Sequence, residues 1–322
     1  MNARSLGLGI LGFLLASGAC LSAASAASWP ERPVRIIIPW PPGGSTDIVG
    51  RLVAAELDQR LKQRVIIDNR AGAGGIVGMQ ISASSPPDGY TLMLTSTAYG
   101  YLINRANVDL VKSFAPVALL GFGDSALVVH PSLPVKSVKQ LIALAKARPG
   151  ALNYASSGVG GFPHMNTELF KLKTGVNMVH VPFKGGGPAA ADLVAGHTQL
   201  MIASLVSVMP FINMGRLKIL GVGSLTRNPH LPDVPTISEA GVPGYETYIW
   251  WGMFAPNGTP PAVISRIHAE TVTVLASREL QKKIEEQGGL TRNMSSAEFG
   301  KLMVSETAKW SQVIKAAGIK EE

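Results

Sequence analysis

Residues 34–61 read VRIIIPWPPGGSTDIVGRLVAAELDQRL, and their order is typical of an α/β protein. A run of aliphatic residues comes first and leads into a turn that is rich in proline and glycine. The remainder carries an apolar residue at every fourth position: Val49, Val53, Leu57 and Leu61. Residues with this spacing lie along one face of a helix. The stretch therefore predicts a buried strand, a tight loop and a helix that begins directly after the loop.

The same order recurs along the chain. It is found again in RVIIDNRAGAGGIVG from residue 64, YTLMLTST from 90, LNYASSGVGGFPHMN from 152 and NMVHVPFKGGGPAAA from 177. Further strand candidates lie at 115–122, 126–130 and 217–224. Strands that alternate with helices predict an α/β fold with largely parallel sheets. Because ligands of open α/β sheets bind at the carboxyl ends of strands, we expect these five loops to line one cleft between two domains.

The first 27 residues are expected to lie outside this fold. Arg4 precedes an apolar stretch at 6–15, and the small residues that follow end in Ala24-Ser25-Ala26. This order is that of a secretory signal peptide, and the apolar run is shorter than a membrane span requires. We expect cleavage after Ala26 or Ala27.

Cys20 is the only cysteine and lies inside the predicted signal peptide. Lipidation at Cys20 is the less favoured alternative, since residues 17–19 lack the large aliphatic residue expected three positions upstream. After cleavage the chain would have no disulfide and no thiolate metal ligand. No later segment has 18 unbroken apolar residues, so we expect a soluble mature protein.

Length and charge define the class of protein further. The 322 residues are 46% hydrophobic and 16% charged, which is sufficient for two globular domains. The net charge of +8 favours small anions. A nucleic-acid partner is not expected, because the basic residues are scattered and no zinc-finger or aromatic-basic signature occurs.

Nucleotide and hydrolase motifs are absent from the sequence. No Gly-Lys-Ser or Gly-Lys-Thr occurs, and in the predicted loops the G-x-G sequences that begin at Gly72 and Gly158 lack the third glycine at the required spacing. Neither G-x-S-x-G nor H-E-x-x-H is present. For His164, a capping or loop hydrogen bond is favoured over catalysis, and His180 is interpreted as a core residue.

With these motifs absent, the sequence favours a site that binds a ligand without reacting with it. Glycines and hydroxyl residues precede the predicted helices, and a helix N-terminus binds anions through free N–H groups and the helix dipole. The alternative is that these residues only cap their helices. Asp47 is interpreted as a dipole partner of its helix. Lys184 has two equal interpretations, a contact with the ligand or exposure to solvent beside Gly185.

Seven sequence motifs in order carry a family resemblance: PWPPGGSTDIVGR, IIDNRAGAGGIVG, PPDGYTLMLTST, YASSGVGGFPHMNTELF, VPFKGGGPAAADLVAGH, LPDVPTISEAGVPGYE and WWGMFAPNGTP. From residue 29 onward the chain resembles the tripartite tricarboxylate transporter substrate-binding proteins, also called the Bug family. The resemblance implies a type II-like periplasmic binding protein with a ligand cleft between two α/β domains. We expect residues 28–127 and 248–322 to form the first domain, with 128–247 inserted as the second.

The resemblance also implies function. The expected protein is a periplasmic, monomeric receptor that delivers a small organic anion, a carboxylate, to the permease subunits of a tripartite transporter. No cofactor, metal or catalytic activity is expected. The alternatives are a ligand-binding subunit of a signalling system and, less favoured, a secreted α/β enzyme.

The chain departs from the family pattern at two places. Gly160-Gly161 replaces a Gly-x-Gly-Ser, which removes a hydroxyl and lets Phe162 form an apolar wall. Ala203 and Ser204 stand near the position where many members carry an acidic residue, which disfavours a ligand with an ammonium group. The expected ligand-binding residues are Gly44, Ser45, Thr46, Gly74, Ser96, Thr97, Ser156, Ser157, Gly160, Gly161, Phe162, His164, Lys184, Gly185 and Ser204.

Overall fold

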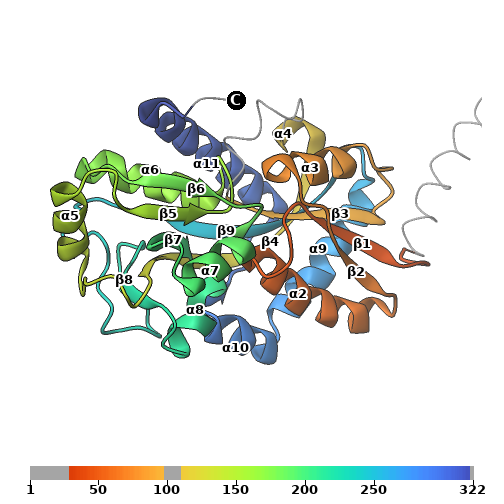
Figure 1. Ribbon diagram of the computed structural model, residues 1–322. Coiled ribbons are helices and arrows are strands. Elements are labelled where there is room, and N and C mark those ends of the chain that lie inside the picture. Colours follow the sequence, from red (N-terminus) through yellow and green to blue (C-terminus); the bar gives the residue numbers. More distant parts are fainter. Residues whose placement is uncertain (1–28, 98–109, 320–322) are drawn as a thin grey trace, which may run out of the picture.

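The computed structural model describes residues 29–97 and 110–319, which form two lobes joined side by side (Figure 1). The first lobe begins with the predicted strand, loop and helix, and its elements in chain order are β1 (Val34–Ile38), α2 (Ser45–Leu61), β2 (Val65–Asn69), the 3₁₀ turn η1 (Ala73–Gly75), α3 (Ile76–Ala83) and β3 (Thr91–Ser96). Strand β1 is almost entirely buried, as its aliphatic sequence predicts.

The second lobe repeats the strand, loop and helix order. A short α4 (Leu110–Ser113) and the long β4 (Phe114–Val129) lead into it. Its elements are α5 (Val138–Ala147), β5 (Asn153–Ser156), α6 (Phe162–Thr174), β6 (Val179–Pro182), α7 (Gly186–Ala195), β7 (Leu200–Ser204), α8 (Leu205–Asn213) and β8 (Lys218–Val222). The chain then returns to the first lobe with β9 (Tyr248–Pro256), α9 (Pro261–Leu275), α10 (Arg278–Glu286), β10 (Gly289–Thr291) and α11 (Ser296–Ala317).

Strand β4 connects the lobes. Its first part, up to Asp124, pairs with β9, and its last part, from Ser125, pairs with β7 and β8. The segment that leads back to the first lobe crosses beside the residue at which β4 changes partner, since the Ser125 hydroxyl lies 2.6 Å from the Thr247 hydroxyl. Helix α11 also reaches across and contacts α6 of the second lobe (Figure 1). The two lobes are therefore linked by adjacent crossings and one long helix.

The expectation of largely parallel sheets is wrong in part. The strands that carry the predicted loops pair in parallel, β1 with β2 and β3, and β5 with β6 and β7. Strand β9 is antiparallel to β3 and β4, and β4 is antiparallel to β7, β8 and β10. The reason is that β4 and β9 serve as crossing strands, and the two segments predicted as separate strands at 115–122 and 126–130 form this one strand.

The lobes have separate cores. In the second lobe the end of β4 alternates, with Leu127 and Val129 packing on one face of the sheet and Ala126 and Val128 on the other. In the first lobe Phe299 of α11 packs against Trp250 and Phe254 of β9. Within the described residues, no helix is both long and apolar enough to cross a membrane.

Strand β10 interrupts the C-terminal helices, because its three residues extend the first sheet along β4. Helix α11 begins after a local capping motif. Ser295 is the N-cap, and it forms a capping box with Glu298.

Candidate functional site

Four helix N-termini surround a small cavity of about 50 Å³ between the lobes. Helix α2 comes from the first lobe, and α6, α7 and α8 come from the second. Each contributes residues of its N-cap or first turn to the wall. The lining residues are Trp40, Gly44, Ser45, Thr46, Ser96, Ser157, Phe162, Pro163, Gly186, Met201, Ser204, Ser207 and Ile249. Because the first N–H groups of a helix have no partner within it, this arrangement concentrates hydrogen-bond donors on one small space.

The loop before α2 is held in place by a buried acidic side chain. Asp47 accepts a hydrogen bond from the Gly43 N–H at 3.1 Å and pairs with Arg51 at 3.0 Å. The Asn69 amide donates both to Asp47 and to the Trp40 carbonyl. Asp47 therefore serves the loop and its helix rather than the cavity, in agreement with the interpretation from sequence.

Ser204 has the environment of a binding group. It is the N-cap of α8, is only 4% exposed, and its hydroxyl has no hydrogen-bond partner among the residues that the structure describes. A buried hydroxyl without a partner costs free energy unless a water or ligand satisfies it. On the opposite wall, the Ser45 hydroxyl accepts a hydrogen bond from the Trp251 indole at 3.3 Å and retains its own proton for donation.

Among the described residues that line the small cavity, none is charged. The electrostatic attraction for an anion there comes from the positive ends of the helix dipoles and from N–H and O–H donors. A planar carboxylate matches such a set of convergent donors, and apolar Phe162, Met201 and Ile249 complete the wall.

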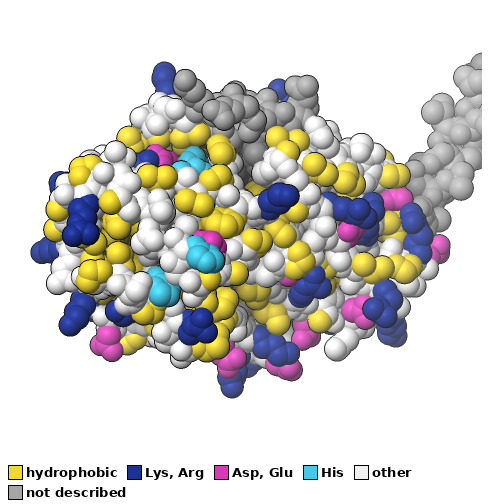
Figure 2. Space-filling model, in the orientation of Figure 1, with side chains coloured by type: hydrophobic (Ala, Val, Ile, Leu, Met, Phe, Trp, Pro, Cys, Tyr) yellow, Lys and Arg dark blue, Asp and Glu magenta, His cyan; other side chains and the backbone are white. Residues whose placement is uncertain are grey.

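A second, larger cavity of about 540 Å³ lies beside the first and shares Trp40 and Ser157 with it. Its wall comes from both lobes: the loop at 71–75 on one side, and Gly158, Val159 and Phe183 on the other. Of the described residues that line it, Lys184 alone is charged. We call this space the vestibule. The surface is hollowed between the lobes in Figure 2, and the Lys and Arg side chains on that face are spread out instead of forming one patch.

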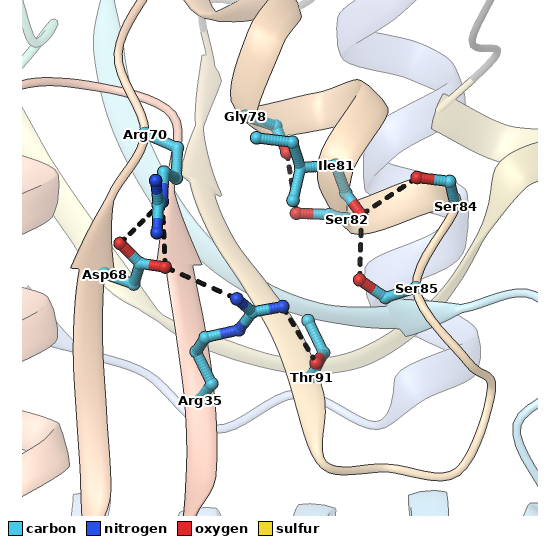
Figure 3. A network of polar contacts seen from close by, with 9 residues as sticks. All are labelled: Arg35, Asp68, Arg70, Gly78, Ile81, Ser82, Ser84, Ser85 and Thr91. Carbon is cyan, nitrogen blue, oxygen red and sulfur yellow. Dashed lines mark hydrogen bonds and ion pairs between the residues drawn. The ribbon is translucent and has the colours of Figure 1, made fainter.

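Arg70, the other cation of the predicted loops, is directed elsewhere. Its guanidinium lies 2.8 Å from Asp68, which also faces Arg35 at 3.6 Å (Figure 3). Arg70 lines neither cavity.

The expected ligand-binding residues divide into three groups. Gly44, Ser45, Thr46, Ser96, Ser157, Phe162 and Ser204 line the small cavity. Gly74 and Lys184 line the vestibule, together with Ser157. The remaining six line neither space: Thr97, Ser156, Gly160, Gly161, His164 and Gly185.

These six residues have structural partners. The Thr97 hydroxyl accepts from the backbone N–H of Trp250 at 2.8 Å. The Ser156 hydroxyl accepts from the Gly158 N–H at 3.1 Å, and His164 accepts from the Gly160 N–H at 3.1 Å. A side chain at Gly161 would collide with the Ser157 hydroxyl, and one at Gly185 would collide with the ring of Pro41. The hydrogen bond of His164 is of the kind expected from its position.

The lobes approach each other closely at two glycines, Gly187 and Gly43. A methyl group on Gly187 of α7 would lie 2.7 Å from the Pro42 carbonyl oxygen and 3.4 Å from the Gly43 Cα. Both atoms belong to the loop before α2, in the opposite lobe. The structure therefore brings the N-terminus of α7 against the first loop, with the small cavity beside the contact.

The sequence interpretation missed Trp40, Pro163, Gly186, Met201, Ser207 and Ile249 as lining residues. Trp40, Pro163 and Gly186 lie within loops that had been identified, so their proximity to the predicted residues was a usable signal. Met201 and Ile249 lie in buried strands, and nothing in their local sequence separates them from other core positions.

Comparison with known proteins agrees with this geometry. The family model described as tripartite tricarboxylate transporter family receptor matches residues 49–319. BugT of Bordetella pertussis is 34% identical over 99% of this chain and 99% of its own.

Two solved structures are similar throughout. Rpa4515 of R. palustris, determined with adipate, is 37% identical, with a TM-score of 0.87 over 91% of this chain and 99% of that one. MatC (Rpa3494) of Rhodopseudomonas palustris, determined with bound malate, is 30% identical, with a TM-score of 0.85 over 89% of this chain and 100% of that one. The expected two-domain periplasmic binding protein fold is thereby confirmed. The chain belongs to the tripartite tricarboxylate transporter receptor family, as its loop motifs predicted.

Proposed function

We propose that the protein captures a small organic anion by seating one carboxylate in the small cavity and the rest of the molecule in the vestibule. The observation that carries the proposal is the wall of the small cavity, where the described residues are uncharged and combine four helix N-termini with the Ser204 hydroxyl, which has no partner among them. Donors of this kind bind a carboxylate without a side-chain ion pair. The adipate and malate named for two relatives are both carboxylates, which supports the same ligand class here.

The volumes support a division of the ligand between the two spaces. About 50 Å³ is enough for a head group and too little for a whole dicarboxylate, whereas the vestibule of about 540 Å³ is ample for a body of several carbon atoms. Lys184 at the vestibule is suitably placed for a second anionic group. It is exposed, so we expect it to contribute less than the buried donors.

The remaining parts of the proposal concern the cell. We propose that the receptor acts in the periplasm after removal of the N-terminal signal, as a monomer, and that it hands its ligand to the permease subunits of a tripartite transporter without chemical turnover. The predicted signal peptide lies outside the described residues, and its support is the sequence pattern.

The test is isothermal titration calorimetry with adipate, malate and a monocarboxylate of similar length. Lys184→Ala should weaken the binding of the dicarboxylates by up to about tenfold, the size of a partly exposed charge-assisted contact, and leave the monocarboxylate unchanged. Lys173→Ala is the matched control, since Lys173 is an exposed lysine of the same lobe and lines neither cavity. Failure of every carboxylate to bind, or complete loss of monocarboxylate binding in Lys184→Ala, would contradict the proposal.

A further inference from the structure

Three aromatic rings form a stack behind the glycine loop at 157–161. His180 of β6 lies in the middle, 4.1 Å from the ring centre of His164 in α6 and 5.0 Å from that of Tyr154 in β5. The ring planes are inclined by 20° and 14°. The loop therefore rests on side chains from three elements that lie apart in the sequence.

The stack is joined to the loop by hydrogen bonds. His164 Nδ1 accepts the Gly160 N–H at 3.1 Å. His180 Nε2 lies 2.5 Å from the Ser156 hydroxyl, which in turn accepts the Gly158 N–H at 3.1 Å. The other side of the loop faces the ligand spaces, because Ser157 lines both of them. The histidines thus hold the loop on the side away from the cleft. On its other side the loop presents a hydroxyl and the N-terminus of α6 to the cleft.

This geometry requires a neutral His164. Only an unprotonated Nδ1 can accept a hydrogen bond, so the ring proton of His164 resides on Nε2. A cationic imidazole would present an N–H to the N–H of Gly160, and the bond would be lost. Two stacked rings 4.1 Å apart also resist carrying charge together.

Burial, more than the surrounding charges, disfavours an imidazolium at His164. Glu168 lies one turn after His164 on α6, but it is already engaged by the Tyr154 hydroxyl at 2.5 Å and by Lys171 at 2.7 Å. Burial is the main cause that lowers the pKa of His164 to about 4, with opposite contributions from Glu168 and Lys171. Burial and the proximity of His164 likewise lower the pKa of His180 to about 4.

We propose that neutral His164, supported by His180, is a positioning residue that holds the Gly158–Gly161 loop in its binding form, and that protonation of this pair in acid releases the loop and weakens ligand binding. His164 lines neither cavity, so its effect passes through the loop backbone. The statement about binding rests on the proposed function, whereas the statement about the loop does not.

Two substitutions separate the hydrogen bond from the stack. His164→Phe keeps a flat ring and removes the acceptor. His164→Asn removes the ring and places a side-chain oxygen, which does not titrate, near the position of Nδ1. His197→Asn is the matched control, because His197 is an exposed histidine of the same lobe that bonds to Asp192.

The first measurement is hydrogen exchange of the Gly160 amide by NMR in the ligand-free protein at neutral pH. We expect exchange at least about tenfold faster in His164→Phe, since a typical hydrogen bond is lost, and near wild-type exchange in His164→Asn and His197→Asn. Unchanged protection in His164→Phe would overturn the positioning role. This measurement needs no ligand and decides the matter even if the proposed function is wrong.

The second measurement is calorimetry with adipate and malate from pH 7 to about pH 3.5, a window that includes the pKa of about 4 of both histidines. At each pH all variants encounter the same protonation state of the ligand, so differences between variants report on the protein. We expect wild-type and His197→Asn affinities to fall more steeply in acid than that of His164→Asn, and His164→Phe to bind about five- to a hundredfold more weakly at pH 7. If His164→Asn follows the wild-type pH profile, the acid release is refuted.

Discussion

Closure of the cleft can be tested at a single glycine, Gly187. The residue lies in α7 with helical backbone, so alanine is compatible with its local conformation. The added methyl group would lie 2.7 Å from the Pro42 carbonyl oxygen across the cleft. The atoms nearest to this methyl group belong to the backbone of Pro42 and Gly43, and backbone atoms cannot rotate away as a side chain can. The clash is relieved only if the lobes move apart.

The expected magnitude follows from the cost of overpacking. Forcing an extra methyl group into a packed contact costs about 1–3 kcal/mol, which corresponds to about a five- to 150-fold rise in Kd. Ligand-free protein can open and avoid the clash. Alanine also favours a helix over glycine by about 0.5–1 kcal/mol, so the thermal stability of the free protein should not fall.

The assay is calorimetry of Gly187→Ala with a carboxylate that binds the wild type, beginning with adipate and malate, together with small-angle scattering with and without ligand. Gly300→Ala in α11 is the matched control, since its methyl group would meet only the Pro116 ring at 3.7 Å. Wild-type protein should contract on binding, and Gly187→Ala should contract less. Equal Kd values for wild type and Gly187→Ala would refute the idea that binding requires this contact between lobes.

Three further changes test the site and its support. Ser204→Ala should weaken carboxylate binding by about two- to tenfold without lowering the free energy of unfolding, because the hydroxyl has no hydrogen-bond partner to lose among the described residues; calorimetry and urea denaturation check this, and a destabilised variant would contradict it. Asp47→Ala should lower the free energy of unfolding by about 1–3 kcal/mol, because the Gly43 N–H and Arg51 lose their acceptor; an unchanged urea midpoint would argue against this network. In the unfolded chain His164 takes up a proton below about pH 6.5, whereas in the native protein it resists protonation until about pH 4. The stability that neutral His164 contributes is therefore complete above pH 6.5 and is lost as the pH falls from about 6.5 to about 4. The unfolding free energy of wild type should therefore decrease more between these pH values than that of His164→Asn, and equal slopes would oppose this assignment.

Local sequence was sufficient for the elements that carry the site. The strand, turn and helix from residue 34 to residue 61 form where the aliphatic run, the proline–glycine turn and the four-residue spacing place them. Such patterns act within a few residues, through helix periodicity and backbone restriction by proline and glycine. The same local signals identified Ser45 and Ser157 as candidates, the family resemblance identified Ser204, and all three line the small cavity.

Pairing between distant segments decided the rest. That β4 runs unbroken from Phe114 to Val129 and changes partner at Ser125 depends on β7, β8 and β9, which lie far along the chain. Whether a loop glycine faces the ligand or the opposite lobe is likewise absent from its own sequence: Gly187 meets Pro42 only after the lobes assemble. Propensity and periodicity determine which segments become strands, loops and helices, whereas burial of their apolar faces against remote partners determines which side of each loop is left for a ligand.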